Sequence, residues 1–147
     1  MNRNCHILLV EDNEGDIILT LEAFKDVKMI NSIDVVRDGE RALRYLAKQS
    51  EYSNAITPDL ILLDINLPKL DGIEVLQNVK EDPKLSLIPV IVLTTSNDKR
   101  DIFDSYKAHA NCFITKPVNY SNFTEVIKTL KDFWINIAQL PKINFSV

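Results

Sequence analysis

Glycine is scarce in this chain, whose 147 residues include only Gly15, Gly39 and Gly72. A Walker phosphate-binding loop and a dinucleotide-binding fingerprint both need glycines a few residues apart. These three glycines are too widely separated to form either motif. The sequence therefore excludes the common glycine-rich nucleotide-binding sites.

Cysteine and long apolar runs are also lacking. The two cysteines, Cys5 and Cys112, are too few for a disulfide framework and lack metal-site spacing, so we expect reduced, structural thiols. No apolar run approaches the roughly 20 residues that a membrane helix needs. The opening MNRNCH has no apolar core of a signal peptide, so we predict a cytoplasmic protein with no membrane partner.

Positive charge is in deficit, with a net charge of −4. This argues against direct nucleic-acid binding, which favours a basic face. An apolar content of 46% and a charged content of 26% are ordinary for a globular protein. The length suits one domain, for which we expect a core over about 5–138, a tail over 139–147 and no output domain.

Short apolar runs alternate with longer amphipathic ones along the chain. The pattern predicts strands over 5–10, 32–37, 59–63, 90–93 and 111–114, and helices over 14–27, 38–47, 71–82, 98–108 and 120–138. Such alternation favours an α/β fold: a doubly wound (βα)5 three-layer sandwich of flavodoxin-like type, with a parallel sheet of order 2-1-3-4-5. The third and fourth runs are continuously apolar, as central strands require.

Polar residues follow these strands at the edge where parallel strands share their carboxyl ends. Glu11 and Asp12 follow the first strand, Asp64 the third, Thr94 the fourth and Lys116 the fifth. Three crowded carboxylates need a cation or raised pKa values, and Mg²⁺ prefers such oxygen ligands. A lysine and a hydroxyl beside Mg²⁺ suit a phosphoryl group, which a carboxylate such as Asp64 could accept covalently.

Each of these residues alone has a more ordinary explanation. An acidic residue after a strand is often the N-cap of the next helix, and this is all we expect of Asp38, which follows an outer strand, and of Asp71. A single lysine or threonine is more often a surface or turn residue. Only the conjunction at one edge of the sheet predicts a site.

Four stretches carry a family resemblance: ILLVEDN over 7–13, LILLDINLPKLDG over 60–72, PVIVLTT over 89–95 and FITKP over 113–117. Together they closely resemble the receiver domain of two-component response regulators, along nearly the whole chain. The LVEDN opening, the long 49–58 loop, ANCFITKP over 110–117 and DFW over 132–134 resemble the single-domain regulators of bacterial, cyanobacterial-type phytochromes.

The resemblance implies a set of roles around the phosphoacceptor. Asp64 would accept a phosphoryl group from a phosphohistidine on a sensor histidine kinase, here a phytochrome. Asp12 and Asp64 would bind Mg²⁺ directly, together with the backbone carbonyl of Asn66. Glu11 would act through a metal-bound water.

The resemblance also implies how the signal leaves the site. Lys116 would pair with a phosphoryl oxygen, and a cis bond to Pro117 would aim it. Thr94 would swing toward the phosphoryl group and Phe113 would turn inward behind it. Phe113 stands where many relatives have tyrosine, so no hydroxyl is available there. His109, where relatives often carry glycine, is expected at a helix C-terminus with a structural role.

The last predicted helix has an apolar stripe longer than the sheet needs. Its members are Phe123, Val126, Ile127, Leu130, Phe133, Trp134 and Ile137. We expect phosphorylation to switch the surface of the fourth helix, fifth strand and fifth helix, and we expect a homodimer through that surface. A core face followed by a disordered tail is the alternative explanation of the stripe.

Two other functions stay open at this point. One is a phosphatase of the haloacid-dehalogenase type, with an aspartyl-phosphate intermediate. Those enzymes carry Asp-x-Asp after the first strand, where this chain has Glu11, Asp12 and Asn13, and no acid lies two residues after Asp64. The other is a degenerate receiver that acts without phosphorylation, against which the full set of site residues argues.

Overall fold

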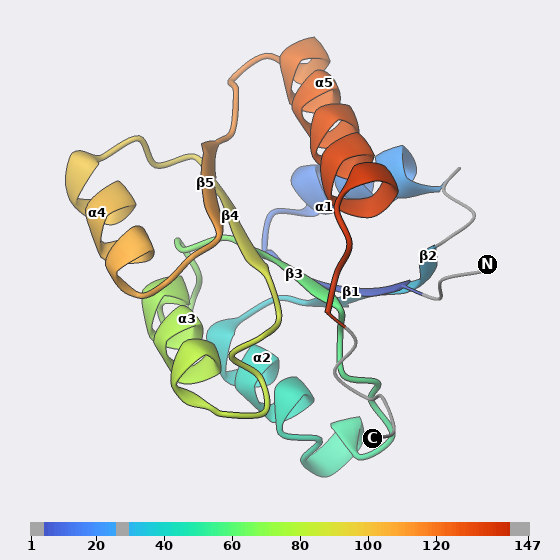
Figure 1. Cartoon of the computed structure of the whole chain (residues 1–147). Coiled ribbons are helices and arrows are strands. Elements are labelled where there is room, and N and C mark those ends of the chain that lie inside the picture. The colour runs from blue at the N-terminus through green and yellow to red at the C-terminus, as the bar shows by residue number, and fades with distance from the viewer. Residues whose placement is uncertain (1–4, 26–29, 142–147) are drawn as a thin grey trace.

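The computed structural model describes residues 5–25 and 30–141. Within them, strands and helices alternate along the chain (Figure 1). The bounds are β1 Cys5–Val10, α1 Glu14–Phe24, β2 Ile30–Val36, α2 Gly39–Leu46, η1 Ser50–Tyr52, β3 Leu60–Leu63, α3 Gly72–Glu81, β4 Val90–Thr94, α4 Lys99–Lys107, β5 Cys112–Thr115, α5 Tyr120–Lys131 and η2 Asp132–Ile137. None of the described helices is long and apolar enough to cross a membrane.

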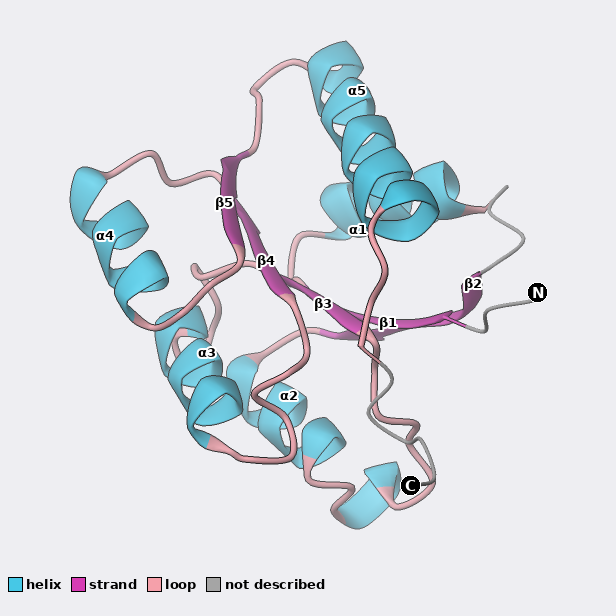
Figure 2. Ribbon diagram, in the orientation of Figure 1, coloured by secondary structure: helices cyan, strands magenta, loops and turns pink. Residues whose placement is uncertain are grey.

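The strands form one parallel sheet of order β2-β1-β3-β4-β5, which confirms the predicted fold. Figure 2 shows this sheet between two layers of helices, with α1 and α5 on one face and α2, α3 and α4 on the other. Every residue of β3 and β4 is buried, as their apolar runs predicted.

Two apolar cores hold these layers together. On one face, Ile17 and Phe24 of α1 and Ile127 of α5 pack against the sheet. On the other, Val75 and Leu76 of α3 belong to a second buried cluster. Because alternate strand residues point to opposite faces, each central strand contributes to both cores. The sheet is therefore a rigid platform for the loops at its edge.

The strand register aligns the ends that carry the polar residues. Val10 of β1 pairs with Leu63 of β3, and Leu63 pairs in turn with Val92 of β4. Glu11 and Asp64, which follow Val10 and Leu63, thus lie side by side at the edge of the sheet. On the far side of β4, Thr94 pairs with Thr115 of β5.

Side-chain caps start each α-helix just after a loop. The N-cap side chain accepts a backbone N–H of the first turn at Asn13, Asp38, Asp71, Asp98 and Asn119. The predicted capping roles of Asp38 and Asp71 are confirmed. At the other end of α4, His109 has a φ of 72°, the left-handed conformation common just past a helix, which agrees with its expected place at a helix C-terminus.

Most strand boundaries differ from the predictions by one or two residues, and β2, for example, begins at Ile30 where residue 32 was predicted. The first helix ends at Phe24, and the predicted end at residue 27 lies outside the described residues, as do residues 142–147 of the predicted tail. The loop over 49–58 contains the short turn η1.

The last helix does not stay α-helical to residue 138, because it widens into the π-helical turn η2. There, Ala138 donates its N–H to the carbonyl of Phe133, 2.7 Å away. The wider turn brings Ile135 to the same face as Leu130, five residues earlier, and both are buried.

Candidate functional site

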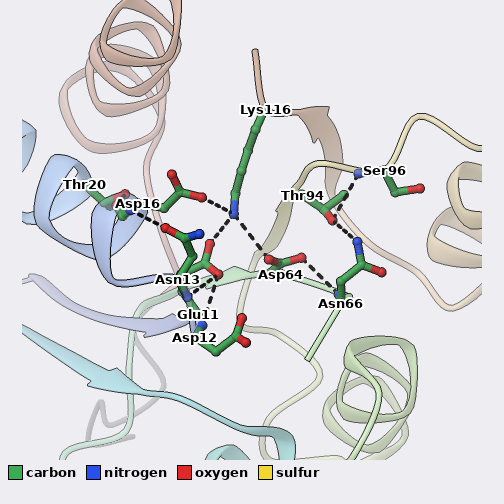
Figure 3. Close-up of polar contacts among 10 residues, drawn as sticks. All are labelled: Glu11, Asp12, Asn13, Asp16, Thr20, Asp64, Asn66, Thr94, Ser96 and Lys116. Carbon is green, nitrogen blue, oxygen red and sulfur yellow. Dashed lines mark hydrogen bonds and ion pairs between the residues drawn. The ribbon is translucent and has the colours of Figure 1, made fainter. Parts of the chain in front are cut away.

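The predicted carboxylates meet at the edge of the sheet. One oxygen of each of Glu11, Asp12 and Asp64 lies within 4.8 Å of the others. Glu11 and Asp64 are buried, whereas Asp12 is exposed. Figure 3 shows Glu11 and Asp12 at the end of β1, to the left of Asp64, with Asp12 the lower of the two. The carboxylate cluster is thus exposed to solvent at Asp12.

Backbone amides hold the two buried carboxylates in place. Glu11 Oε2 accepts the N–H of Asp12 at 3.0 Å and that of Asn13 at 3.2 Å. Asp64 Oδ1 accepts the N–H of Asn66 at 3.0 Å. The main chain itself is tied to the sheet, because the Asp64 N–H donates to the carbonyl of Val10 at 3.0 Å. These contacts orient both carboxylates before any ligand binds.

Lys116 reaches into the middle of the cluster from the end of β5. Its ammonium Nζ forms ion pairs with Glu11, with Asp16 at 2.9 Å and with Asp64 at 3.2 Å. The lysine side chain is 3% exposed. An ammonium has three N–H donors, so these carboxylates use all of them. Figure 3 shows the lysine descending between Asp16 and Asp64.

Burial and neighbouring charges both shift the pKa values of Glu11 and Lys116. Burial raises the pKa of Glu11 to about 7; the hydrogen bond from Lys116 opposes this shift, and the charge of Asp64 adds to it. Burial alone would lower the pKa of Lys116, but its hydrogen bonds to Glu11 and Asp16 and the charge of Asp64 raise it overall. Lys116 therefore stays protonated, but its single positive charge does not balance the negative charges of the carboxylates around it.

Thr94 and Asn66 complete the other side of the site. Thr94 is fully buried, and its Oγ1 accepts Nδ2 of Asn66 at 3.3 Å and the N–H of Ser96 at 3.4 Å. The backbone N–H of Lys116 donates to the backbone carbonyl of Thr94 at 2.6 Å, which ties the end of β5 to the end of β4. Asn66 thus contacts both Asp64 and Thr94, a bridge that its predicted role as a carbonyl ligand did not include.

Phe113 lies on β5, two residues before Thr115, which is the strand partner of Thr94. Its side chain is half-buried against the core of the α3 face. Its backbone N–H points outward from the edge strand and donates to the hydroxyl of Tyr106 on α4 at 3.1 Å. Strand β5 is therefore linked to α4 on one side and to the site on the other.

One predicted detail is wrong. The structure has no cis peptide bond among the described residues, so the bond between Lys116 and Pro117 is trans. A trans bond before proline is favoured by about 0.5–1 kcal/mol. The extended side chain of Lys116 reaches its three carboxylates with this geometry.

Asp16 is a site residue that sequence reasoning missed. It lies in the first turn of α1, four residues after Asp12, and no motif marked it. The available signal was position, because α1 begins directly at the carboxyl edge of β1 and points its first turn at the same crevice. An acidic residue there is easily mistaken for one that merely favours the helix N-terminus.

The donor set fits a hard divalent cation. All the available ligand atoms of Glu11, Asp12 and Asp64 are carboxylate oxygens, and the described residues offer no histidine or cysteine to this cluster. Mg²⁺ and Mn²⁺ favour such ligands. A cation would also offset the negative charge that Lys116 leaves uncompensated.

Comparison with known proteins agrees with this geometry. The family model described as "Response regulator receiver domain" matches residues 7–128. Response regulator Rcp1 of Synechocystis sp. is 43% identical over 135 residues, covering 92% of each chain. The probable methanogenesis regulatory protein FilR2 of Methanothrix harundinacea is 37% identical over 135 residues, covering 92% of this chain and 86% of FilR2.

Solved structures give the same result. The phosphorylated cyanobacterial phytochrome response regulator RcpA superposes with a TM-score of 0.92 at 49% identity, covering 95% of this chain and 99% of RcpA. The Mn²⁺-bound form of Rcp1 superposes with a TM-score of 0.90 at 42% identity, covering 94% and 99%. The matches in sequence and fold lead to one conclusion: the chain belongs to the response regulator receiver domain family and is similar to its phytochrome-associated members.

Proposed function

We propose that Asp64 accepts a phosphoryl group from a phosphohistidine of a sensor histidine kinase, and that this kinase is a phytochrome. The observation that carries the proposal is the position of Asp64: a buried carboxylate at a strand end, 3.2 Å from Lys116 and grouped with Glu11 and Asp12. The similarity to RcpA and Rcp1 supports the choice of kinase. A cytoplasmic location, with no nucleic acid or membrane as a direct partner, is part of the same proposal.

The transfer is an in-line displacement at phosphorus. A carboxylate oxygen of Asp64 forms a bond to phosphorus while the phosphorus–nitrogen bond of the phosphohistidine breaks, and the imidazole nitrogen keeps the electron pair. Asn66 holds Asp64 Oδ1 through its backbone amide, which orients the nucleophile. The protein thus promotes its own phosphorylation and later dephosphorylation without being a conventional enzyme.

Mg²⁺ is the proposed cofactor. Asp12, Asp64 and the backbone carbonyl of Asn66 would hold it, and Glu11 would act through a bound water. When bound, the cation neutralises charge that develops on the phosphoryl oxygens. The protein's own contribution is to keep Glu11 and Asp64 oriented through backbone amides, so that the site needs little rearrangement.

Lys116 and Thr94 would report the new phosphoryl group, which adds about −1.5 to −2 charge. Lys116 would pair with one oxygen, Thr94 would donate its hydroxyl to another, and Phe113 would turn inward behind it. A shift from 1% to 99% of the active state needs about 5.5 kcal/mol. Two or three charge-assisted hydrogen bonds of about 1.5–3 kcal/mol each would supply about 3–9 kcal/mol, a range that includes this value.

The proposed output is the surface formed by α4, β5 and α5, through which two copies would dimerise. Large exposed apolar side chains lie in or next to these elements: Phe103 and Tyr106 in α4, Val118 and Tyr120 between β5 and the first turn of α5, and Phe133 and Ile137 in η2. Sedimentation at tens of micromolar should detect the dimer. Phe103→Glu should weaken it, whereas Leu87→Glu, equally exposed at 62% but outside this surface, should not. A monomer with and without a phosphoryl mimic would contradict this part of the proposal.

One experiment tests the phosphoacceptor directly. The protein is incubated with Mg²⁺ and acetyl phosphate, and intact mass and acid-labile phosphate are measured. We expect a gain of one phosphate that Asp64→Asn abolishes. No gain would support a receiver that acts without phosphorylation, and rapid multiple turnover would support a phosphatase.

A further inference from the structure

Asp16 is the one partner of Lys116 that the proposed reaction does not use. It comes from α1, whereas Glu11 and Asp64 follow strands of the sheet. Its Oδ2 lies 2.9 Å from Lys116 Nζ, closer than the 3.2 Å between Nζ and Asp64. It lies outside the group of carboxylates that could share a cation. Asp16 therefore interacts with the site through the lysine alone.

The three partners of Lys116 differ in how easily they can release it. The carboxylate of Glu11 is 4% exposed, and leaving such a buried carboxylate without its partner strongly destabilises the protein. Asp64 is 7% exposed, but it is no longer a free carboxylate once it carries the phosphoryl group. The carboxylate of Asp16 is 24% exposed, so water can replace the lysine there. The negative charge of the phosphoryl group on Asp64 draws the ammonium toward it, and of the two carboxylates that remain, Asp16 is the one whose release is least unfavourable.

The main chain around Asp16 allows such a release without unfolding α1. The Asp16 N–H donates to Oδ1 of the N-cap Asn13 at 3.0 Å, and the Asp16 carbonyl accepts the hydroxyl of Thr20 at 2.7 Å. These bonds fix the backbone and leave only the side chain to rotate. The carboxylate can therefore turn outward while the first turn of the helix stays in place.

We propose that Asp16 is a positioning residue, the exchangeable partner of Lys116: it holds the ammonium over the site before phosphorylation and yields its hydrogen bond to the phosphoryl group. The inference rests on the proposed function of Asp64. It predicts that the Asp16–Lys116 ion pair opposes the phosphorylated state. Asp16→Asn keeps the shape but removes the charge, so it should favour that state.

Beryllium fluoride with Mg²⁺, a stable mimic of an aspartyl phosphate, is the probe. Calorimetric titration of wild type, Asp16→Asn and Asp16→Ser should show that both variants bind the mimic about fivefold more tightly, the size expected of a partly exposed ion pair. Glu14→Gln is the matched control. It removes one negative charge from the same helical turn, but Glu14 pairs with Arg37 and not with Lys116. We expect it to bind as wild type does.

A spectroscopic readout separates this role from a structural one. The side-chain ammonium of Lys116 is followed by ¹H–¹⁵N NMR and assigned through its loss in Lys116→Arg. Its signal should differ between wild type and Asp16→Asn in the free proteins. In the mimic-bound proteins the two signals should coincide, because the lysine has left Asp16.

Two results would overturn the inference: unchanged or weaker binding of the mimic by both Asp16 variants, or a signal difference that persists in the bound state. Either leaves the function of Asp64 intact, provided that wild type binds the mimic. Failure of wild type itself to bind it would instead contradict the proposed function, on which the role of Asp16 depends.

Discussion

Replacing Gly72 with alanine tests how closely α3 packs behind the phosphoacceptor. A Cβ at this position would lie 2.5 Å from the backbone carbonyl oxygen of Asp64 and would also collide with Cα of Ile65. Cα of Ile65 is the nearer of the two, at 2.4 Å, and ordinary contact begins at 3.4 Å, so α3 and the segment that follows β3 must separate by about 1.0 Å. Both obstacles are backbone atoms and cannot rotate away.

The expected magnitude follows from two opposed effects. Overpacking of this kind destabilises proteins by about 1–3 kcal/mol. Replacing glycine in a compatible conformation stabilises by about 0.4–1 kcal/mol through the unfolded chain. Gly72→Ala should therefore lower the free energy of unfolding by about 1–2 kcal/mol. Because the collision displaces Asp64, phosphorylation by acetyl phosphate should slow by more than tenfold, as misplacement by about 1 Å does in other active sites.

Urea denaturation followed by circular dichroism measures the first effect, and the rate of phosphate incorporation measures the second. Gly15→Ala is the matched control, because its Cβ would meet only Oδ1 of Asn13 at 3.4 Å. In α1 this change should be neutral or stabilise by up to about 1 kcal/mol. If Gly72→Ala matched wild type in stability and rate, the close packing of α3 against β3 would not be what positions Asp64.

Three further changes test other parts of the molecule. Lys116→Met leaves buried carboxylates unpaired, so it should lower the free energy of unfolding by about 3–5 kcal/mol. Thermal melts should show that this loss shrinks as Mg²⁺ is added. A loss that does not depend on Mg²⁺ would contradict a cation site at these carboxylates. Lys80→Met removes hydrogen bonds to two backbone carbonyls between α3 and β4, so urea denaturation should show a loss of about 1–3 kcal/mol; wild-type stability would mean that these bonds contribute nothing. Leu8 is fully buried, so Leu8→Ala leaves a cavity in the core and should lower the free energy of unfolding by about 2–5 kcal/mol. Leu87 is 62% exposed, so Leu87→Ala should change the free energy of unfolding, measured with urea, only a little. Equal effects of the two changes would refute the assignment of Leu8 to the core.

Much of the fold was predictable because it follows local patterns. The apolar runs of β3 and β4 are buried on both faces, and the polar loop residues Asp38 and Asp71 cap helices where the pattern changes. The parallel sheet follows from the alternation itself. Parallel strands end at one edge, so the meeting of Glu11 and Asp64 was predictable without knowledge of any side-chain contact.

What could not be predicted depends on side-chain reach and on packing between distant segments. Asp16 joins the site only because Lys116, a hundred positions away, extends to it. Asn66 contacts Thr94 through its amide, which no local pattern records. The widening of the last helix depends on how Ile135 meets the sheet face, and that requires the whole core.

The central claim is that Asp64 is the phosphoacceptor, and chemical trapping tests it most directly. The protein is treated with Mg²⁺ and acetyl phosphate, then reduced with borohydride, which converts an acyl phosphate to the corresponding alcohol. Peptide mass spectrometry should find this conversion at Asp64 alone, and only when Mg²⁺ is present. Conversion at Glu11 or Asp12 instead, or none in a protein that binds Mg²⁺, would contradict the account.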